Sequence, residues 1–231
     1  MTGGTGRFAS VFKKIKQNKK IFYPSKKILD LKNFNSIRKY VRKIKPDYLI
    51  HCAALSRPMD IHEKNIEESI SRNIIGTCNI VRVCSQEKIK LVYFSTNYVY
   101  PGTKGNYSEN DPVAPINNYA LSKFGGECAV QMYKNSLILR VCMAEKPFIH
   151  KQAFNDVETN FMYHEDFAKN LLKLIDKKGI LNVGGPKKIV FDFAKKTNPK
   201  VKPISAKKIL GKKFPLKQSM NINKKLKIIQ K

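Results

Sequence analysis

The chain has 231 residues, 42% of them hydrophobic, and its 45 Lys and Arg against 17 Asp and Glu give a formal net charge of +28. This composition supports a packed core of one domain, or of one domain with a small lobe, and excludes a disordered chain. No apolar run reaches the roughly 18 residues that a membrane-spanning helix needs, and the N-terminus lacks the order of a signal peptide. Five cysteines without metal-type C-x-x-C spacing indicate reduced thiols in a cytoplasmic protein.

Positive charge is concentrated at the C-terminal end of the chain. Residues 186–231 contain 15 Lys, no Arg and one acid, Asp192. We interpret the stretch as a lysine-rich, solvated surface, with a site for an anionic substrate as the alternative. A nucleic-acid partner is not expected, because basic and aromatic residues do not interleave here.

Short apolar runs alternate with helical patterns, which is typical of βαβ units around a parallel sheet. Strands are predicted at residues 20–24, 48–53, 90–95, 137–142 and 180–183. Helices are predicted at residues 8–16, 34–44, 67–86, 118–134 and 166–176. Residues 101–115 are predicted to form a loop, and the tail from residue 195 to be irregular. The prediction is an α/β fold with a doubly wound, Rossmann-like parallel sheet over residues 1–142. Residues 143–231 would form a small C-terminal lobe with the last strand and the basic tail.

A glycine-rich turn opens the chain, in which Gly3, Gly6 and Ala9 fit the pattern G-x-x-G-x-x-G/A. Such glycines permit a tight turn and let a pyrophosphate approach the backbone, while the next helix directs its N–H groups at the phosphate. A generic glycine-rich turn is the alternative. The pattern should follow the central strand of the sheet, but no strand can precede Thr2. We therefore expect the first strand to be missing or truncated by roughly five residues.

Two further segments are placed to bind the rest of a dinucleotide. Ser25 and Lys26 end the second predicted strand, where NAD-binding proteins often carry an acid, so NADP is favoured over NAD. The abundance of Lys in this chain is the alternative explanation. Asp30 and Leu31 follow in a loop that can flank an adenine.

A small-residue segment follows the strand at residues 48–53. Cys52, Ala53 and Ala54 leave room for a ligand at the strand's carboxyl end, although close packing also explains them. Asn73 interrupts a helical pattern, where it either bridges backbone groups near the site or caps a turn.

A candidate catalytic set combines Thr96, Tyr119 and Lys123. Tyr119 and Lys123 are four residues apart and share one face of a predicted helix. A nearby ammonium favours the phenolate and lowers the pKa of a tyrosine from about 10. Thr96 ends a strand and can bond the same substrate oxygen. Together these groups predict a proton donor beside a carbonyl that receives hydride.

These motifs resemble the extended short-chain dehydrogenase/reductases, and within them most closely the dTDP-4-dehydrorhamnose reductases. The residues that carry the superfamily resemblance are Thr2-Gly3-Gly4-x-Gly6, Cys52-Ala53-Ala54, Asn73, Ser95-Thr96 and Tyr119-x-x-x-Lys123. Those that carry the closer resemblance are residues 95–100, 102–105, 107–112, Pro115, Tyr119, Ser122-Lys123, Gly126-Glu127 and 215–221. The likeness covers nearly the whole chain.

The resemblance implies an NADP(H)-linked reductase of a nucleotide-activated 4-keto-6-deoxy sugar. Thr96 would polarise the ketone, Tyr119 would donate the proton, and Lys123 would lower the tyrosine's pKa and hold the nicotinamide ribose. The residues implied to bind the cofactor are Gly3, Gly6, Arg7, Phe8, Ser25, Lys26, Asp30, Leu31, Cys52, Ala53, Ala54, Tyr119 and Lys123. Basic residues of the tail would contact the nucleotide diphosphate, and no metal is expected.

Other readings stay open. Asn97 stands where the subfamily usually has Asp and the sugar-nucleotide dehydratases an Asp-Glu pair, so dehydration is not expected. The alternatives are another sugar-nucleotide epimerase or reductase, and a non-catalytic NADP-binding subunit similar to the regulatory subunit of methionine adenosyltransferase. Gly125 and Gly126 each cost about 1 kcal/mol in a helix relative to Ala and indicate close approach of another helix, such as that of a homodimer partner.

Overall fold

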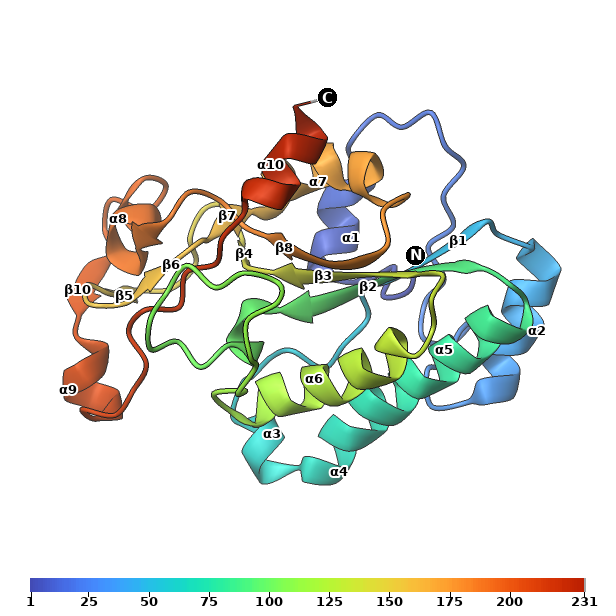
Figure 1. Ribbon diagram of the computed structural model, residues 1–231, viewed down its shortest axis with the longest axis horizontal. Coiled ribbons are helices and arrows are strands. Elements are labelled where there is room, and N and C mark those ends of the chain that lie inside the picture. The colour runs from blue at the N-terminus through green and yellow to red at the C-terminus, as the bar shows by residue number, and fades with distance from the viewer. Residues whose placement is uncertain (231) are drawn as a thin grey trace. The chain divides into compact units, whose positions relative to one another are not determined.

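The computed structural model describes residues 1–230 and has a central four-stranded sheet (Figure 1). Its strands, in spatial order, are β1 (Tyr48–His51), β2 (Lys90–Thr96), β3 (Ser136–Val141) and β8 (Gly179–Val183). β1 and β2 run parallel, with Tyr48 opposite Lys90 and His51 opposite Tyr93. Every residue of β2 and β3 is buried, as in the inner strands of parallel sheets. The predicted α/β fold with a parallel sheet is confirmed.

Thr2 lies beside β1, where the expected first strand would run. Its backbone N–H donates to the Ile50 carbonyl at 2.9 Å, and the residue forms an isolated parallel bridge with His51. The Met1 ammonium donates to the Phe22 carbonyl at 2.8 Å. Residues 20–24 were predicted to be a strand, and this is wrong: they form no strand in the described chain. The strand expected beside residues 20–24 is represented by Thr2, which forms a single bridge, and that bridge is to His51. Residues 20–24 therefore have no strand to pair with among the described residues.

Three helices pack on one face of β1, β2 and β3. They are α2 (Phe34–Ile44), α5 (Gly76–Gln86) and α6 (Asn118–Gln131). Their buried side chains share one core with the strands, built from Leu29, Ile37, Val41, Leu49, Ile80, Val83, Cys84, Ile89, Leu91, Tyr93, Val130 and Ile138. The short α1 (Arg7–Phe12) lies on the opposite face (Figure 1), where the Phe8 ring meets Phe94 of β2 at 5.2 Å.

The helix predicted at residues 67–86 consists of three segments. α4 (Ile66–Ser69) passes into the π-helical η1 (Ile70–Ile75) and then into α5, while the short α3 (Ile61–Lys64) comes just before. Insertions of π-helix are rare and often occur at functional sites. Here the insertion carries Asn73, whose side chain accepts from Leu55 N–H at 2.8 Å and donates to the Leu55 carbonyl at 2.9 Å. The extent of the helix was predicted well, but its π-helical part was not.

The chain divides into two compact units. One contains Met1–Ser95, Asn117–Leu139 and Ile175–Ile180, and the other Thr96–Ile116, Arg140–Leu174 and the residues from Leu181 onward. Both β3 and β8 begin in the first unit and end in the second. The units therefore interleave along the chain, whereas the predicted division at residue 142 is contiguous and stays a prediction.

The second unit is built from short elements. They are η2 (Asn97–Val99), β4 (Met143–Ala144), β5 (Gln152–Phe154), β6 (Glu158–Thr159), β7 (Met162–Tyr163), α7 (His164–Leu174), β9 (Lys188–Ile189), α8 (Val190–Lys195), β10 (Lys202–Ile204), α9 (Ala206–Leu210) and α10 (Asn223–Ile229). β4 pairs with β7, β5 with β10 and β6 with β9. The prediction of an irregular tail is wrong, since β10, α9 and α10 lie in it. Asp156 holds the start of α9 by accepting from Ala206 N–H at 2.8 Å.

None of the helices within residues 1–230 combines the length and the apolar character needed to cross a lipid bilayer.

Candidate active site

The glycine-rich turn folds back on itself before α1. Gly3 has a φ of +68°, a conformation that favours glycine, and its carbonyl accepts from Gly6 N–H at 2.8 Å. A Cβ at Gly4 would lie 2.5 Å from the carbonyl carbon of Tyr23. The turn therefore needs glycine at both positions. The close approach at Gly4 also shows that the turn lies beside the segment that leads to Ser25.

The loop predicted to flank an adenine is anchored to α5. The Leu31 carbonyl accepts from the Asn79 side chain at 3.0 Å, and the Asp30 carboxylate accepts from Lys32 N–H at 3.1 Å. Earlier in the same loop Ser25 is half-buried and Lys26 is exposed, so the lysine ammonium is accessible to an anionic group.

The residues after β1 meet the glycine-rich turn directly. The Cys52 thiol donates to the Thr2 carbonyl at 2.9 Å, and the Ala53 N–H donates to the Thr2 hydroxyl at 3.2 Å. A Cβ at Gly3 would lie 3.0 Å from the Cα of Ala53. From α1 the Arg7 guanidinium donates to the Ser56 hydroxyl at 3.0 Å. The structure thus brings together two of the sequence segments that were predicted to bind a dinucleotide.

Tyr119 and Lys123 lie one turn apart on α6, as the spacing predicted. The helix begins after Asn117, whose side chain accepts from Ala120 N–H at 2.8 Å. Lys123 is 3% exposed, and its ammonium lies 4.2 Å from the centre of the Tyr93 ring. Burial lowers the pKa of Lys123 from 10.5 to about 7, while the neighbouring Cys52 and Glu127 act in the opposite direction. Burial raises the pKa of Cys52 to about 11, so the thiol that bonds Thr2 is neutral.

Thr96 is the last residue of β2 and is 4% exposed. Its hydroxyl accepts from Tyr98 N–H at 3.3 Å, and the residue belongs to the second compact unit. Ser95, just before it, belongs to the first unit and donates to the Glu127 carboxylate of α6 at 2.5 Å. The end of β2 is thereby held to the helix that carries Tyr119 and Lys123, and the joint action of Thr96 with this pair stays a prediction.

His51 is a residue of this region that the sequence analysis missed. The last residue of β1, it is fully buried between two threonines. Its Nδ1 lies 2.8 Å from the Thr2 hydroxyl and its Nε2 lies 3.1 Å from the Thr77 hydroxyl. Burial, reinforced by the Lys123 ammonium, lowers the pKa of His51 to about 3, so the ring is neutral at physiological pH.

The hydrogen bonds around His51 define its tautomer. Thr77 donates its hydroxyl proton to the Asn73 carbonyl at 2.7 Å, so it can only accept from the imidazole. We therefore assign the proton of His51 to Nε2, and the Thr2 hydroxyl donates to Nδ1. Asn73 continues the chain by donating to the Ser122 hydroxyl at 2.8 Å. A buried line of hydrogen bonds thus runs from the glycine-rich turn to α6.

The two glycines of α6 have neighbours within the chain. A Cβ at Gly126 would lie 2.7 Å from the Asn73 carbonyl oxygen, and one at Gly125 would lie 2.9 Å from the end of the Ile74 side chain. Close approach of another helix was expected, and the helix is η1 of the same chain. These glycines therefore give no support to a homodimer.

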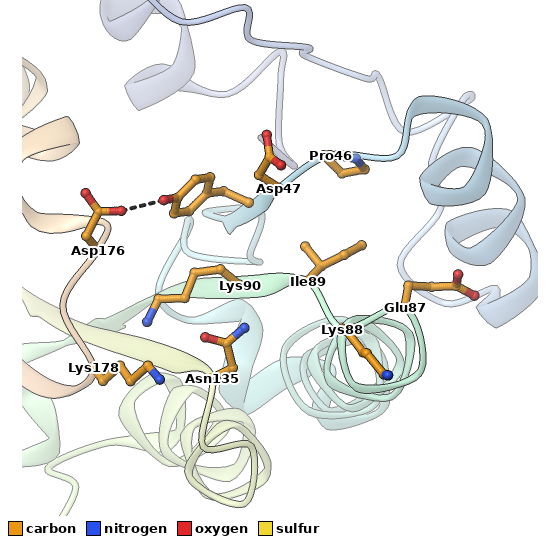
Figure 2. A pocket seen from close by; sticks show the side chains of 10 residues that line it. Pro46, Asp47, Glu87, Lys88, Ile89, Lys90, Asn135, Asp176 and Lys178 are labelled. Carbon is orange, nitrogen blue, oxygen red and sulfur yellow. Dashed lines mark hydrogen bonds between the residues drawn. The ribbon is translucent and has the colours of Figure 1, made fainter.

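A hollow of about 450 Å³ lies at the opposite end of the strands (Figure 2). Asp47, Lys90, Asn135 and Lys178 line it, and each begins one of the four strands or directly precedes it. The Lys90 ammonium donates to the Lys177 carbonyl at 2.7 Å. None of the predicted site residues lines this hollow. Among residues 1–230, no cluster of His, Cys, Asp and Glu is placed to hold a metal ion.

The parallel sheet and the glycine-rich turn before α1 define a Rossmann-like fold. The family model described as the RmlD substrate binding domain matches residues 1–184. The chain belongs to this family.

Solved structures and curated proteins agree with this assignment. The chain is similar to the Bacillus anthracis dTDP-4-dehydrorhamnose reductase in complex with NADP, with a TM-score of 0.85, 25% identity, and coverage of 98% of this chain and 91% of that one. A hypothetical dTDP-4-dehydrorhamnose reductase from Sulfolobus tokodaii has a TM-score of 0.81, 27% identity, and coverage of 98% and 93%. Methionine adenosyltransferase 2 subunit beta from Xenopus laevis is 32% identical over 151 residues, which are 61% of this chain. The match spans 45% of that relative, less than half of its length.

Proposed function

We propose that the protein is an NADP(H)-dependent reductase of a nucleotide-activated 4-keto-6-deoxy sugar. The observation that carries the proposal is the buried Lys123 ammonium one helical turn from Tyr119 on α6, the helix that a buried line of hydrogen bonds joins to the glycine-rich turn. A reductase needs this combination, in which a cation-assisted tyrosine stands next to a dinucleotide site. The similarity to a reductase in complex with NADP supports the choice of substrate class and cofactor.

The residues present fit a dinucleotide. The positive φ of Gly3 and the bond from Gly6 N–H to the Gly3 carbonyl make a tight, glycine-rich turn whose backbone a pyrophosphate can approach closely. Gly6, Arg7 and Phe8 would complete this end of the site. Lys26 and Ser25 would hold a 2′-phosphate, and the remaining predicted contacts lie in Asp30, Leu31, Cys52, Ala53 and Ala54. When bound, NADPH would supply the hydride that reduces the ketone carbon.

Tyr119 is proposed to protonate the ketone oxygen. The Lys123 ammonium favours the phenolate that remains, because opposite charges a few ångströms apart stabilise each other in a buried site. Thr96 is proposed to polarise the same oxygen through its hydroxyl. Basic residues of the tail are proposed to contact the diphosphate of the sugar nucleotide.

The test is NADPH oxidation by the full chain in the presence of dTDP-4-dehydrorhamnose. We expect turnover in the wild type and a loss of about 100-fold or more in Tyr119→Phe, with NADPH affinity retained. Tyr40→Phe on α2 is the matched control and should leave turnover unchanged. Turnover by Tyr119→Phe at the wild-type rate would refute the mechanism, and no turnover by the wild type would refute the substrate.

A second candidate is a non-catalytic, NADP-binding regulatory subunit. It is favoured by the 32% identity to methionine adenosyltransferase 2 subunit beta. This function predicts co-purification with a methionine adenosyltransferase and NADPH binding without turnover. Another sugar-nucleotide epimerase or reductase would instead turn over a different nucleotide sugar in the same assay.

A further inference from the structure

A buried histidine lies beside the proposed proton donor. His62 belongs to the four-residue helix α3, where the following Glu63 and Lys64 are exposed, yet its own side chain is 1% exposed. Most residues of such a short surface helix face solvent. Burying a polar imidazole costs free energy of desolvation unless its nitrogens form hydrogen bonds, so the partners of both nitrogens matter.

The two nitrogens of the His62 ring differ in their surroundings. Nδ1 lies 2.7 Å from the hydroxyl of Ser69, the last residue of α4, which is itself buried. Nε2 is buried and has no hydrogen-bond partner among the described residues. An unsatisfied buried group costs about 1–3 kcal/mol, and in native proteins such groups concentrate at functional positions.

The phenol ring of Tyr119 packs against this imidazole. The ring centres are 5.2 Å apart and the planes are tilted by 59° to each other, so the two rings are in direct contact without stacking face to face. Asn118 ties the two elements together, since its amide donates to the Glu63 carboxylate at 2.5 Å and to the His62 carbonyl at 3.5 Å. Helix α3 is therefore fixed against the first turn of α6, where Tyr119 lies.

We propose that His62 is a positioning residue for Tyr119 that directs the Nε2–H edge of its imidazole at the phenol ring. In this tautomer the Ser69 hydroxyl donates to Nδ1, so the proton of the neutral ring is on Nε2. An N–H edge against an aromatic face is a weak attraction that strengthens as the ring becomes more electron-rich. His62 would thus hold the Tyr119 ring in one orientation and favour its phenolate. The inference rests on the proposed function for its catalytic meaning, but its geometry does not.

The charges around the pair are consistent with a neutral imidazole. Burial lowers the pKa of His62, and the neighbouring Glu63 acts in the opposite direction. Glu68 on α4 is paired with Lys32 and Arg72 instead. Lys123 on α6 therefore supplies the positive charge one turn from Tyr119, and His62 supplies an oriented dipole.

Three substitutions separate the possible roles of His62. His62→Phe keeps an aromatic ring without nitrogens, His62→Asn keeps an amide near Nδ1 for Ser69, and His62→Gln places an amide near Nε2. The primary measurement uses the free protein with ¹³C-labelled tyrosine, in which Tyr119→Phe identifies the Tyr119 signal. The titration of Tyr119 is followed by NMR in each variant, with urea denaturation as a check of folding.

We expect the ionisation constant of Tyr119 to fall about threefold in His62→Phe and His62→Asn and to stay near the wild-type value in His62→Gln. Turnover should fall by a similar factor with unchanged KM for NADPH. If Tyr119 titrates in His62→Phe as it does in the wild type, the proposal is overturned and the ring of His62 only fills space. If it does so in His62→Asn, the proposal is overturned and the hydrogen bond to Ser69 alone accounts for the role of His62. Should the Phe variant not fold, the Asn and Gln variants still decide. Because the titration needs no sugar substrate, an inactive wild type would refute the proposed function and leave this test intact.

Discussion

The hydroxyl of Thr2 donates a 2.8 Å hydrogen bond to Nδ1 of His51, so a residue of the glycine-rich turn is joined to the carboxyl end of β1 through a neutral histidine. The lowered pKa of His51 makes this link sensitive to acid. In the folded chain the pKa is about 3, against 6.5 for an ordinary histidine. The contribution to stability is present above pH 6.5 and is lost as the pH falls from 6.5 towards 3, at up to about 1.4 kcal/mol per pH unit.

We therefore expect the free energy of unfolding of the wild type to decrease over that pH range, and the decrease to be smaller in His51→Gln. The variant should also be about 1–3 kcal/mol less stable at pH 7, since it leaves a buried partner unsatisfied. Urea denaturation between pH 7 and 4 measures both effects. His150→Gln, at an exposed position, is the control, and equal pH slopes in wild type and His51→Gln would contradict the prediction.

Lys123→Met should lose turnover and gain relative stability near neutral pH. The pKa of Lys123 is lowered from 10.5 to about 7, so the wild type loses stability from this group as the pH falls from 10.5 towards 7. The variant has no such loss, so the difference between its free energy of unfolding and that of the wild type should rise as the pH falls from 10.5 towards 7. Urea denaturation at pH 10, 8.5 and 7 tests this, with Lys207→Met as an exposed control. Turnover should fall by about 100-fold or more because the phenolate loses its cation.

Gly126→Ala and Gly125→Ala form a matched pair on α6. A Cβ at Gly126 meets the backbone oxygen of Asn73, whereas one at Gly125 meets the flexible end of Ile74. Alanine gains about 1 kcal/mol of helix propensity at either site. We expect Gly126→Ala to destabilise the protein by about 2 kcal/mol and Gly125→Ala to change it by less than about 1 kcal/mol. Urea denaturation that ranks the two variants in the opposite order would refute this.

The predicted homodimer has a candidate surface on α6. Leu121 is 51% exposed and shares a face of α6 with the exposed Cys128, and Met132, 86% exposed, follows directly after the helix. The charged residues of this helix are Lys123 and Glu127, and both are buried, so the face carries no charge in a chain with a net charge of +28. The homodimer stays a prediction, and an uncharged face favours it because like charges repel in a chain of this net charge.

Sedimentation analysis should show a concentration-dependent dimer for the wild type and a monomer for Leu121→Glu. Ile209→Glu on α9, with similar exposure, is the control and should dimerise normally. A wild type that stays monomeric at all accessible concentrations would remove the homodimer from consideration.

Local patterns made much of this fold predictable. The predicted helix at residues 34–44 has the observed bounds of α2, because an apolar face and the capping side chain of Asn33 are both adjacent in sequence. The spacing of Tyr119 and Lys123 correctly placed them one turn apart on one helix, while their catalytic role, inferred from this spacing together with Thr96 and the glycine-rich turn, stays a prediction. The features that were missed depend on distant residues. Thr2 and Thr77, the partners of His51, are 49 and 26 residues away from it. The start of α9 is held by a hydrogen bond from Ala206 N–H to the carboxylate of Asp156, which is 50 residues earlier in the chain. No local pattern in the tail can indicate this contact.

The pairing of Thr2 with β1 gives the glycine-rich turn an opening equilibrium of its own. Its amide and hydroxyl hold the turn to Ile50 and His51, and these bonds can break while the core of α2, α5 and α6 stays folded. A dinucleotide that binds only the closed turn has an apparent association constant equal to the intrinsic one multiplied by the fraction of molecules in which the turn is closed. Thr2→Val would then weaken NADPH binding by lowering that fraction, with Gly3 and Gly6 unchanged.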